Sequence, residues 1–197
     1  MRLFSMWCLH VAGPTRRILF GFIFLSFATV VSAQPDDRRV ESIRRLSTQI
    51  NEQIAESERV EESNGIYCNE LVINKGDKSW PAVGIYRVVT KFHYTFGDRE
   101  KDPYPNRLLK ISVTTNRSDR QEYEEYFFNG AGQLVFYFEK ESEDAQSERR
   151  FYFASGRLVR QMTGARTIDS NSGRALAKQV ATRTLALRKM FSASLEN

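Results

Sequence analysis

The stretch Ile85–Phe96, with the sequence IYRVVTKFHYTF, decides the fold class of this chain. Its even positions, from Tyr86 to Phe96, are aromatic or β-branched, whereas the odd positions include Arg87, Lys91 and His93. Alternation of this length is typical of a β-strand with one buried face and one polar face. We therefore expect a long strand in a sheet that is covered by apolar packing on one side.

Runs of similar character lie before and after this strand. Residues 107–116 alternate in the same way, and the segments that follow are joined by short turns rich in Gly and Asn. Connections this short allow antiparallel neighbours but not parallel crossovers, so the pattern predicts an antiparallel β-meander of about seven strands within residues 66–165. The predicted strands are residues 66–74, 85–96, 107–116, 121–129, 133–141, 148–153 and 157–163.

Two segments of the meander resemble each other. Residues 128–135 (FNGAGQLV) match residues 152–159 (YFASGRLV) at an offset of 24 residues. Each contains an aromatic strand end, a turn of small residues with Gly, and an apolar restart. We interpret them as two similar hairpins of one sheet, since a repeat architecture needs at least three stacked units.

Amphipathic helices are predicted on either side of the strands. In residues 34–65 an apolar stripe is formed by Val40, Ile43, Ile50 and Ile54. In residues 166–197 an equivalent stripe is formed by Leu176, Val180, Thr184, Leu187 and Phe191. The expected fold is a single α+β domain, residues 34–197, with both helices on one face of the sheet and the other face open to solvent.

Residues 1–33 read as a secretory signal peptide. Arg16 and Arg17 precede the apolar run of residues 18–31. The run is followed by the small residues Ser32 and Ala33, and we expect cleavage after Ala33. The run has 14 residues, fewer than the roughly 20 needed to span a bilayer. An uncleaved signal anchor is the alternative. No later stretch is long and apolar enough to span a membrane, so the expected product is exported, to a periplasm or as a secreted protein.

The net charge of +5 depends largely on this segment, since residues 1–33 contain three Arg and no acid. Their removal leaves +2, distributed as −3 over residues 34–65, +1 over residues 66–165 and +4 over residues 166–197. An excess this small argues against a nucleic-acid partner. The opposite signs suggest that the two helices could lie side by side on the sheet.

Motifs for catalysis, phosphate binding or metal binding are largely missing. The chain has no G-x-S-x-G, no G-x-x-x-x-G-K-[ST], no H-E-x-x-H and no C-x-x-C, so we expect no cofactor, no metal site and no catalytic residue. After residue 33 one cysteine, Cys68, and one histidine, His93, remain. They could form a nucleophile and base. The favoured interpretation is that Cys68 is a small buried residue and that His93 lies on the polar strand face.

Three glutamates offer the alternative of a carboxylate-dependent hydrolase. Alternation places Glu122 and Glu124 on one face of their strand and Glu125 on the other. Glycoside hydrolysis needs two carboxylates that flank one bond, and the sequence does not show which acids could pair. A solvated strand explains the same residues.

Side chains suited to binding are found at two places. Arg87, Lys91 and His93 share the polar face of one strand, while Trp80 before Pro81 and Tyr104 between two prolines are loop aromatics suited to stacking. We therefore expect a small, exported, non-enzymatic binding domain for a protein or a small ligand.

A third class of function is an envelope accessory protein. It would make weak membrane-surface contact through the basic C-terminal helix. The cations of that helix are Arg174, Lys178, Arg183, Arg188 and Lys189.

Overall fold

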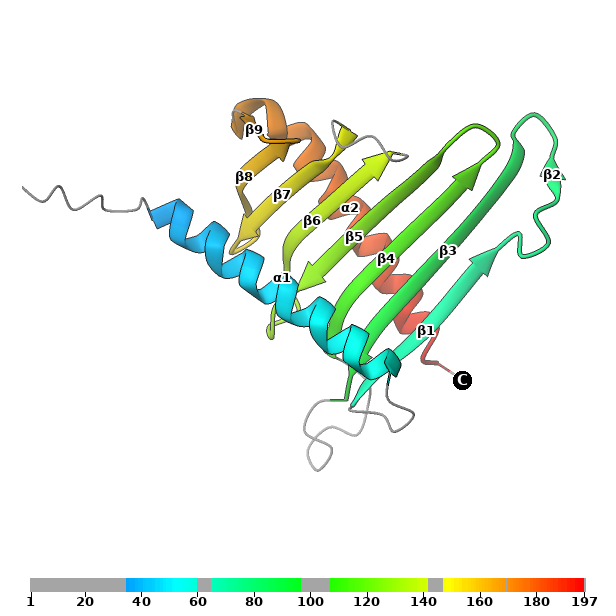
Figure 1. Cartoon of the computed structure of the whole chain (residues 1–197), viewed down its shortest axis with the longest axis horizontal. Coiled ribbons are helices and arrows are strands. Elements are labelled where there is room, and N and C mark those ends of the chain that lie inside the picture. Colours follow the sequence, from blue (N-terminus) through cyan, green and yellow to red (C-terminus); the bar gives the residue numbers. More distant parts are fainter. Residues whose placement is uncertain (1–34, 60–64, 97–106, 142–146, 169, 197) are drawn as a thin grey trace, which may run out of the picture. The chain divides into compact units, whose positions relative to one another are not determined.

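The computed structural model describes residues 35–59, 65–96, 107–141, 147–168 and 170–196, which belong to one compact unit. The predicted signal peptide and Tyr104 lie outside the described residues. The elements are α1 (Pro35–Arg59), β1 (Ile66–Ile73), β2 (Ser79–Trp80), β3 (Gly84–Thr95), β4 (Arg107–Arg117), β5 (Gln121–Phe128), β6 (Leu134–Glu141), β7 (Arg149–Ala154), β8 (Arg157–Thr163), β9 (Arg166–Ile168) and α2 (Ser170–Ala193) (Figure 1).

The strands form one antiparallel sheet of nine strands. Its order is β1-β3-β4-β5-β6-β7-β8-β9, and the short strand β2 pairs with the start of β3. The meander and all seven predicted strands are confirmed. The two additional strands, β2 and β9, are too short to show alternation in the sequence, and β9 takes residues 166–168 that were assigned to the C-terminal helix.

The prediction that both helices lie on one face is wrong. Figure 1 shows α1 in front of the sheet and α2 behind it. The physical reason lies in consecutive aromatic residues of the central strands. In the run Tyr126-Phe127-Phe128, Tyr126 packs in the core beneath α2 and Phe127 packs in the core beneath α1. Successive strand residues point to opposite faces of the sheet, so a run of aromatic residues makes both faces apolar. Each face must then be packed against a helix to be shielded from water.

The larger core lies between the sheet and α2. Val180, Leu187 and Phe191 of the predicted helical stripe pack against strand residues, and the ring of Phe191 lies 5.6 Å from that of Phe92. The even positions of β3 face this core, as the alternation predicts. The buried strand residues are Val88, Phe92, Tyr94, Leu108, Ile111, Val113, Tyr126, Phe128, Tyr137, Phe151 and Phe153.

The smaller core lies between the sheet and α1. All four residues of the predicted α1 stripe are buried there. They pack against Phe127, Val135 and Tyr152, and Arg160 of β8 forms an ion pair with Asp37 at the start of the helix. The acidic first helix and the basic last helix therefore lie on opposite faces, not side by side.

The two similar segments both form hairpin ends, but their registers differ by one residue, because the sequence counterpart of Phe128 is Tyr152 and not Phe153. Leu134 pairs with Phe128 across the β5–β6 turn, and Leu158 pairs with Phe153 across the β7–β8 turn. Both turns contain a glycine in the left-handed region, Gly132 at φ 70° and Gly156 at φ 73°, a conformation that glycine adopts without steric cost. In both hairpins the leucine that follows the turn, Leu134 or Leu158, lies next to α2.

Candidate functional site

A groove of about 680 Å³ runs between α2 and the ends of these two hairpins. Its walls are largely apolar, and none of its lining residues is acidic. The volume falls within the range of about 300–1,000 Å³ that is typical of ligand pockets. The apolar lining consists of Leu134, Phe153, Leu158, Ala177, Ala181 and Leu185.

The residue spacing of α2 explains this hollow. Ala177 and Ala181 lie four residues apart, so they follow one another along the same helix face. Their small side chains leave space between α2 and the sheet, whereas Val180 and Leu187 of the same helix fill the neighbouring core. Leu185 continues the row and is 62% exposed, so the groove ends in an apolar side chain that faces solvent.

Four cations of the described residues line the same groove: Arg157 from the start of β8, and Arg174, Lys178 and Arg188 from α2. Arg188 is held in place, because its Nη1 donates a hydrogen bond of 3.1 Å to the carbonyl oxygen of Gly132. Arg157 and Lys178 are exposed and have no ion pair within the described part of the chain. The groove therefore combines an apolar interior with a rim of one charge sign.

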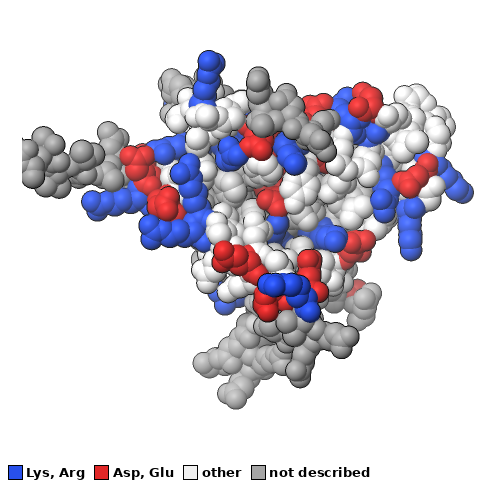
Figure 2. All heavy atoms as spheres, viewed as in Figure 1, with Lys and Arg blue, Asp and Glu red and all other residues white. Residues whose placement is uncertain are grey.

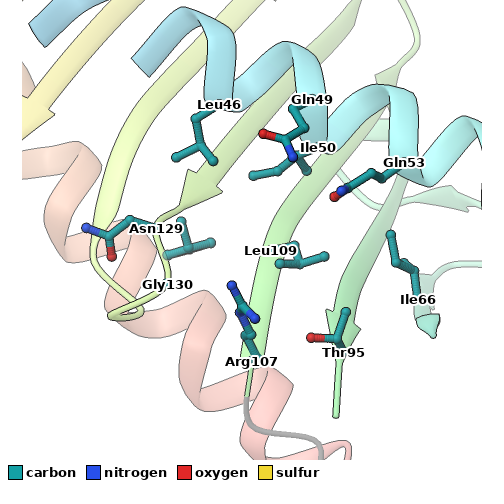
Figure 3. A pocket seen from close by; sticks show the side chains of 11 residues that line it. Leu46, Gln49, Ile50, Gln53, Ile66, Thr95, Arg107, Leu109, Asn129 and Gly130 are labelled. Atoms are coloured by element: carbon teal, nitrogen blue, oxygen red, sulfur yellow. The ribbon is translucent and has the colours of Figure 1, made fainter. Parts of the chain in front are cut away.

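A second, smaller cavity lies under α1 on the opposite face of the sheet, with a volume of about 360 Å³ (Figure 3). Gln49 and Gln53 project from α1 toward the strands, while Thr95 and Arg107 project from the ends of β3 and β4 toward the helix. The remaining lining residues are Leu46, Ile50, Ile66, Leu109, Phe128, Asn129 and Gly130.

Of the predicted site residues, Arg87 and Lys91 are half-buried on the sheet face that carries α1. Each has an acidic neighbour: Arg87 Nε lies 3.7 Å from Asp77 Oδ1, and Lys91 Nζ lies 3.6 Å from Glu70 Oε2. Basic and acidic side chains are intermingled over this face, without a large area of one sign (Figure 2). Because acidic side chains already neutralise part of the charge of Arg87 and Lys91, these residues would attract an anionic ligand less strongly than the cations of the groove.

His93 shares this face but is not exposed, contrary to the expectation of an open polar face. It is 5% exposed. Its ring lies near the end of α1, with Nε2 4.0 Å from Glu58 Oε1, and neither ring nitrogen has a hydrogen-bond partner within the described residues. Burial, together with the charges of Lys110 and Lys91, lowers the pKa of His93 to about 4. The imidazole is therefore neutral at physiological pH.

Cys68 is exposed, not buried as predicted, and it lies directly opposite His93 in the β1–β3 register. The register thus brings together the two residues that could form a nucleophile and base. However, the thiol donates a hydrogen bond to the carbonyl oxygen of Asn69, and desolvation raises the pKa of Cys68. A nucleophilic thiol needs the opposite shift.

Trp80 does not extend this site. Trp80 is 40% exposed, and its ring lies 5.4 Å from that of Tyr86, away from both cavities. Tyr104 lies outside the described residues. Among the four predicted residues that the structure describes, Arg87, Lys91 and His93 share one strand face and Trp80 lies apart from them. Sequence reasoning missed the groove, although the matching segments and the cations of α2 were visible signals.

The structure also shows which acids pair. Glu124 and Glu139 are direct partners on β5 and β6, and the hydroxyl of Tyr137 lies 3.3 Å from Glu124 Oε1 and 2.5 Å from Glu139 Oε2. Burial raises the pKa of Glu124. Each carboxylate also has a guanidinium neighbour, Arg183 for Glu124 and Arg149 for Glu139. Within the described residues, two cavities adjoin this pair: one of about 170 Å³, smaller than typical ligand pockets, and one of about 480 Å³ that is also lined by Glu122.

A buried charged pair lies beneath α1, where the sequence suggested an open polar face. Lys110 forms an ion pair with Glu125, and both side chains are largely buried. The Nζ of Lys110 also donates to Asn51 Oδ1 at 2.7 Å, and the hydroxyl of Tyr123 donates to Glu125 Oε1 at 2.6 Å. These contacts satisfy both charges and attach α1 to the sheet.

Comparison with known protein families, curated proteins and solved structures finds no match to this chain. Among the described residues, no helix has the length and apolar character needed to cross a membrane. The same residues contain no cluster of three or more His, Cys, Asp or Glu suited to hold a metal ion.

Proposed function

We propose that this chain is a small, exported binding domain whose ligand is an acidic amphiphile, with one apolar chain and an anionic head group, bound in the groove beside α2. The observation that carries the proposal is the composition of the groove, whose described lining has an apolar interior, four cations at its edge and no acidic side chain. An apolar ligand would offer no anionic partner to the exposed side chains of Arg157 and Lys178, and a fully polar ligand would leave the apolar interior unfilled.

The two parts of the ligand would contribute unequally. Burying one methylene contributes about 0.8 kcal/mol, so the chain supplies most of the affinity. Exposed ion pairs contribute about 0.2–1 kcal/mol each, so the cations mainly select for the sign of the head group and orient it. The apolar chain of a bound ligand would shield the exposed side chain of Leu185 from water.

The direct test is titration calorimetry of dodecanoate, below its micelle concentration, with variants of α2. Ala181→Trp fills the groove and should weaken binding by about tenfold or more, equivalent to about 1.4 kcal/mol. Ala186→Trp is the matched control, because Ala186 is exposed on the same helix and does not line the groove. Equal binding by both variants would remove the groove as the site.

The role of the cations has its own test. Lys178→Glu should weaken dodecanoate binding several-fold but leave binding of the uncharged dodecanol unchanged. Lys189→Glu changes an exposed residue outside the groove and should affect neither ligand. If Lys178→Glu has no effect on dodecanoate, the ligand carries no acidic head at this position.

The alternative of an envelope accessory protein has less support. The apolar stripe of α2 packs on the sheet, and within the described residues of α2 Leu185 is the one large apolar side chain that is exposed. Cosedimentation with anionic vesicles that persists in Ala181→Trp would favour membrane contact over binding of single amphiphiles.

A hydrolase remains the second candidate, favoured by the raised pKa of Glu124 beside Glu139. In this case Glu124 would act as the general acid. Turnover of nitrophenyl glycosides that is lost in Glu124→Gln, but retained in Glu122→Gln, would support it, whereas no turnover by the unmodified protein would exclude it for these substrates.

A further inference from the structure

The cavity under α1 differs from the groove in the chemistry of its edge. Among the described residues, its lining has one cation, Arg107, and three carboxamides, those of Gln49, Gln53 and Asn129 (Figure 3). The two glutamines lie four residues apart on one face of the helix. The groove, by contrast, is edged mainly by cations. The two cavities lie on opposite faces of the sheet. Because their lining side chains differ, we expect them to select different ligands.

The polar side chains around this cavity differ in their partners: Asn129 forms hydrogen bonds within the β5–β6 turn, whereas Gln49, Gln53 and Arg107 are exposed. Within the described residues, Gln49, Gln53, Thr95 and Arg107 make no side-chain hydrogen bond and no ion pair, although most other arginines of the sheet are paired with acids. The guanidinium of Arg107 lies against the β5–β6 turn, with Nη2 3.6 Å from the position that a Cβ of Gly130 would occupy. A planar cation and two amides thus face one space.

Apolar side chains line the same space from both the helix and the strands. Leu46 and Ile50 descend from α1, and Ile66 and Leu109 lie on the strands (Figure 3). A ligand that matches every wall needs a carboxylate for Arg107, an amide that exchanges hydrogen bonds with the glutamines, and an apolar group for the leucine and isoleucine side chains. The volume, near the lower end of the pocket range, restricts this ligand to a small molecule.

We infer that the cavity under α1 is a second ligand site, which binds a small N-acylated amino acid with an apolar side chain, its carboxylate on Arg107 and its amide between Gln49 and Gln53. The inference does not depend on the amphiphile groove. The same chemistry is present at the C-terminus of a peptide, so the experiment must distinguish these two sources.

The test is an NMR titration of the protein with N-acetyl-leucine. We expect the side-chain amide signals of Gln49 and Gln53 to shift. Arg107→Met should weaken binding at least tenfold, and so should replacing the ligand by N-acetyl-leucinamide, which lacks the carboxylate. Gln53→Glu, which places a negative charge at the same site, should weaken binding by a similar factor.

The matched control is Arg157→Met, which removes a cation from the groove on the other face. It should leave N-acetyl-leucine binding unchanged and weaken dodecanoate binding, with the reverse pattern for Arg107→Met. A tripeptide ending in leucine identifies the source: equal binding assigns the site to peptide C-termini, and much weaker binding assigns it to free acids. No binding of either compound, or binding unaffected by Arg107→Met and Gln53→Glu in folded variants, would overturn the inference.

Discussion

At the scale of single residues, His93 should make stability depend on pH. Its pKa is about 4 in the folded protein, below the ordinary value of 6.5, because burial and two nearby lysines disfavour the charged ring. The unfolded chain therefore binds the proton more readily, and stability falls as pH drops from about 6.5 to about 4. At about 1.4 kcal/mol per pH unit, the loss approaches roughly 3 kcal/mol.

This prediction is checked by urea unfolding of the protein and of His93→Leu across that pH range. The variant should lose stability less steeply on acidification. Parallel curves for the two proteins would mean that His93 is not the group that titrates.

The Lys110–Glu125 pair leads to a second residue-scale prediction. Lys110→Met leaves the buried carboxylate of Glu125 without its cation and should cost about 3–5 kcal/mol of unfolding free energy. The double variant Lys110→Met/Glu125→Met removes both charges and should recover most of this loss. Chemical denaturation of the single and double variants measures the difference. A double variant as unstable as the single one would show that the ion pair is not the cause.

At the scale of elements, the approach of α2 to the sheet depends on Gly173. A Cβ at this position would collide with the buried side-chain oxygen of Gln161 and would lie 3.0 Å from Leu158 Cδ2. In an exposed helix Gly→Ala stabilises, but here overpacking should dominate and cost about 1–3 kcal/mol. Thermal unfolding of Gly173→Ala should show this loss, whereas Thr182→Ala on the exposed face should be neutral or slightly stabilising. A more stable Gly173→Ala would mean that α2 does not pack this closely.

The elements were largely predictable because their signals are local. Alternation in β3 and β4 and the turns after Phe128 and Phe153 are properties of short segments, and so are the apolar stripes of both helices. The face that each helix covers depends on pairing across the sheet, which separates Tyr126 from Phe127. For the same reason His93 seemed solvated, since the sequence does not show which part of the polar face lies beneath α1.

At the scale of the whole molecule, the helices that cover the two faces of the sheet place the groove and the cavity under α1 on opposite faces. If both helices packed on the same face of the sheet, as expected from the sequence, Arg87 and Lys91 would lie on an open binding surface. Instead, the hollows form where each helix meets the turns and strand ends, and their residues come from segments distant in the chain. Sequence reasoning identified the cations of α2 but had no means of placing them beside Leu134 and Leu158.

The central claim, that the groove beside α2 binds an acidic amphiphile by burying its chain, is tested most directly by calorimetry across octanoate, decanoate and dodecanoate below their micelle concentrations. Because each buried methylene contributes about 0.8 kcal/mol, affinity should rise roughly tenfold with each two methylenes. This dependence should flatten in Ala181→Trp. Equal affinity for all three chains, or no binding of any, would show that the groove does not bind an acidic amphiphile through its chain.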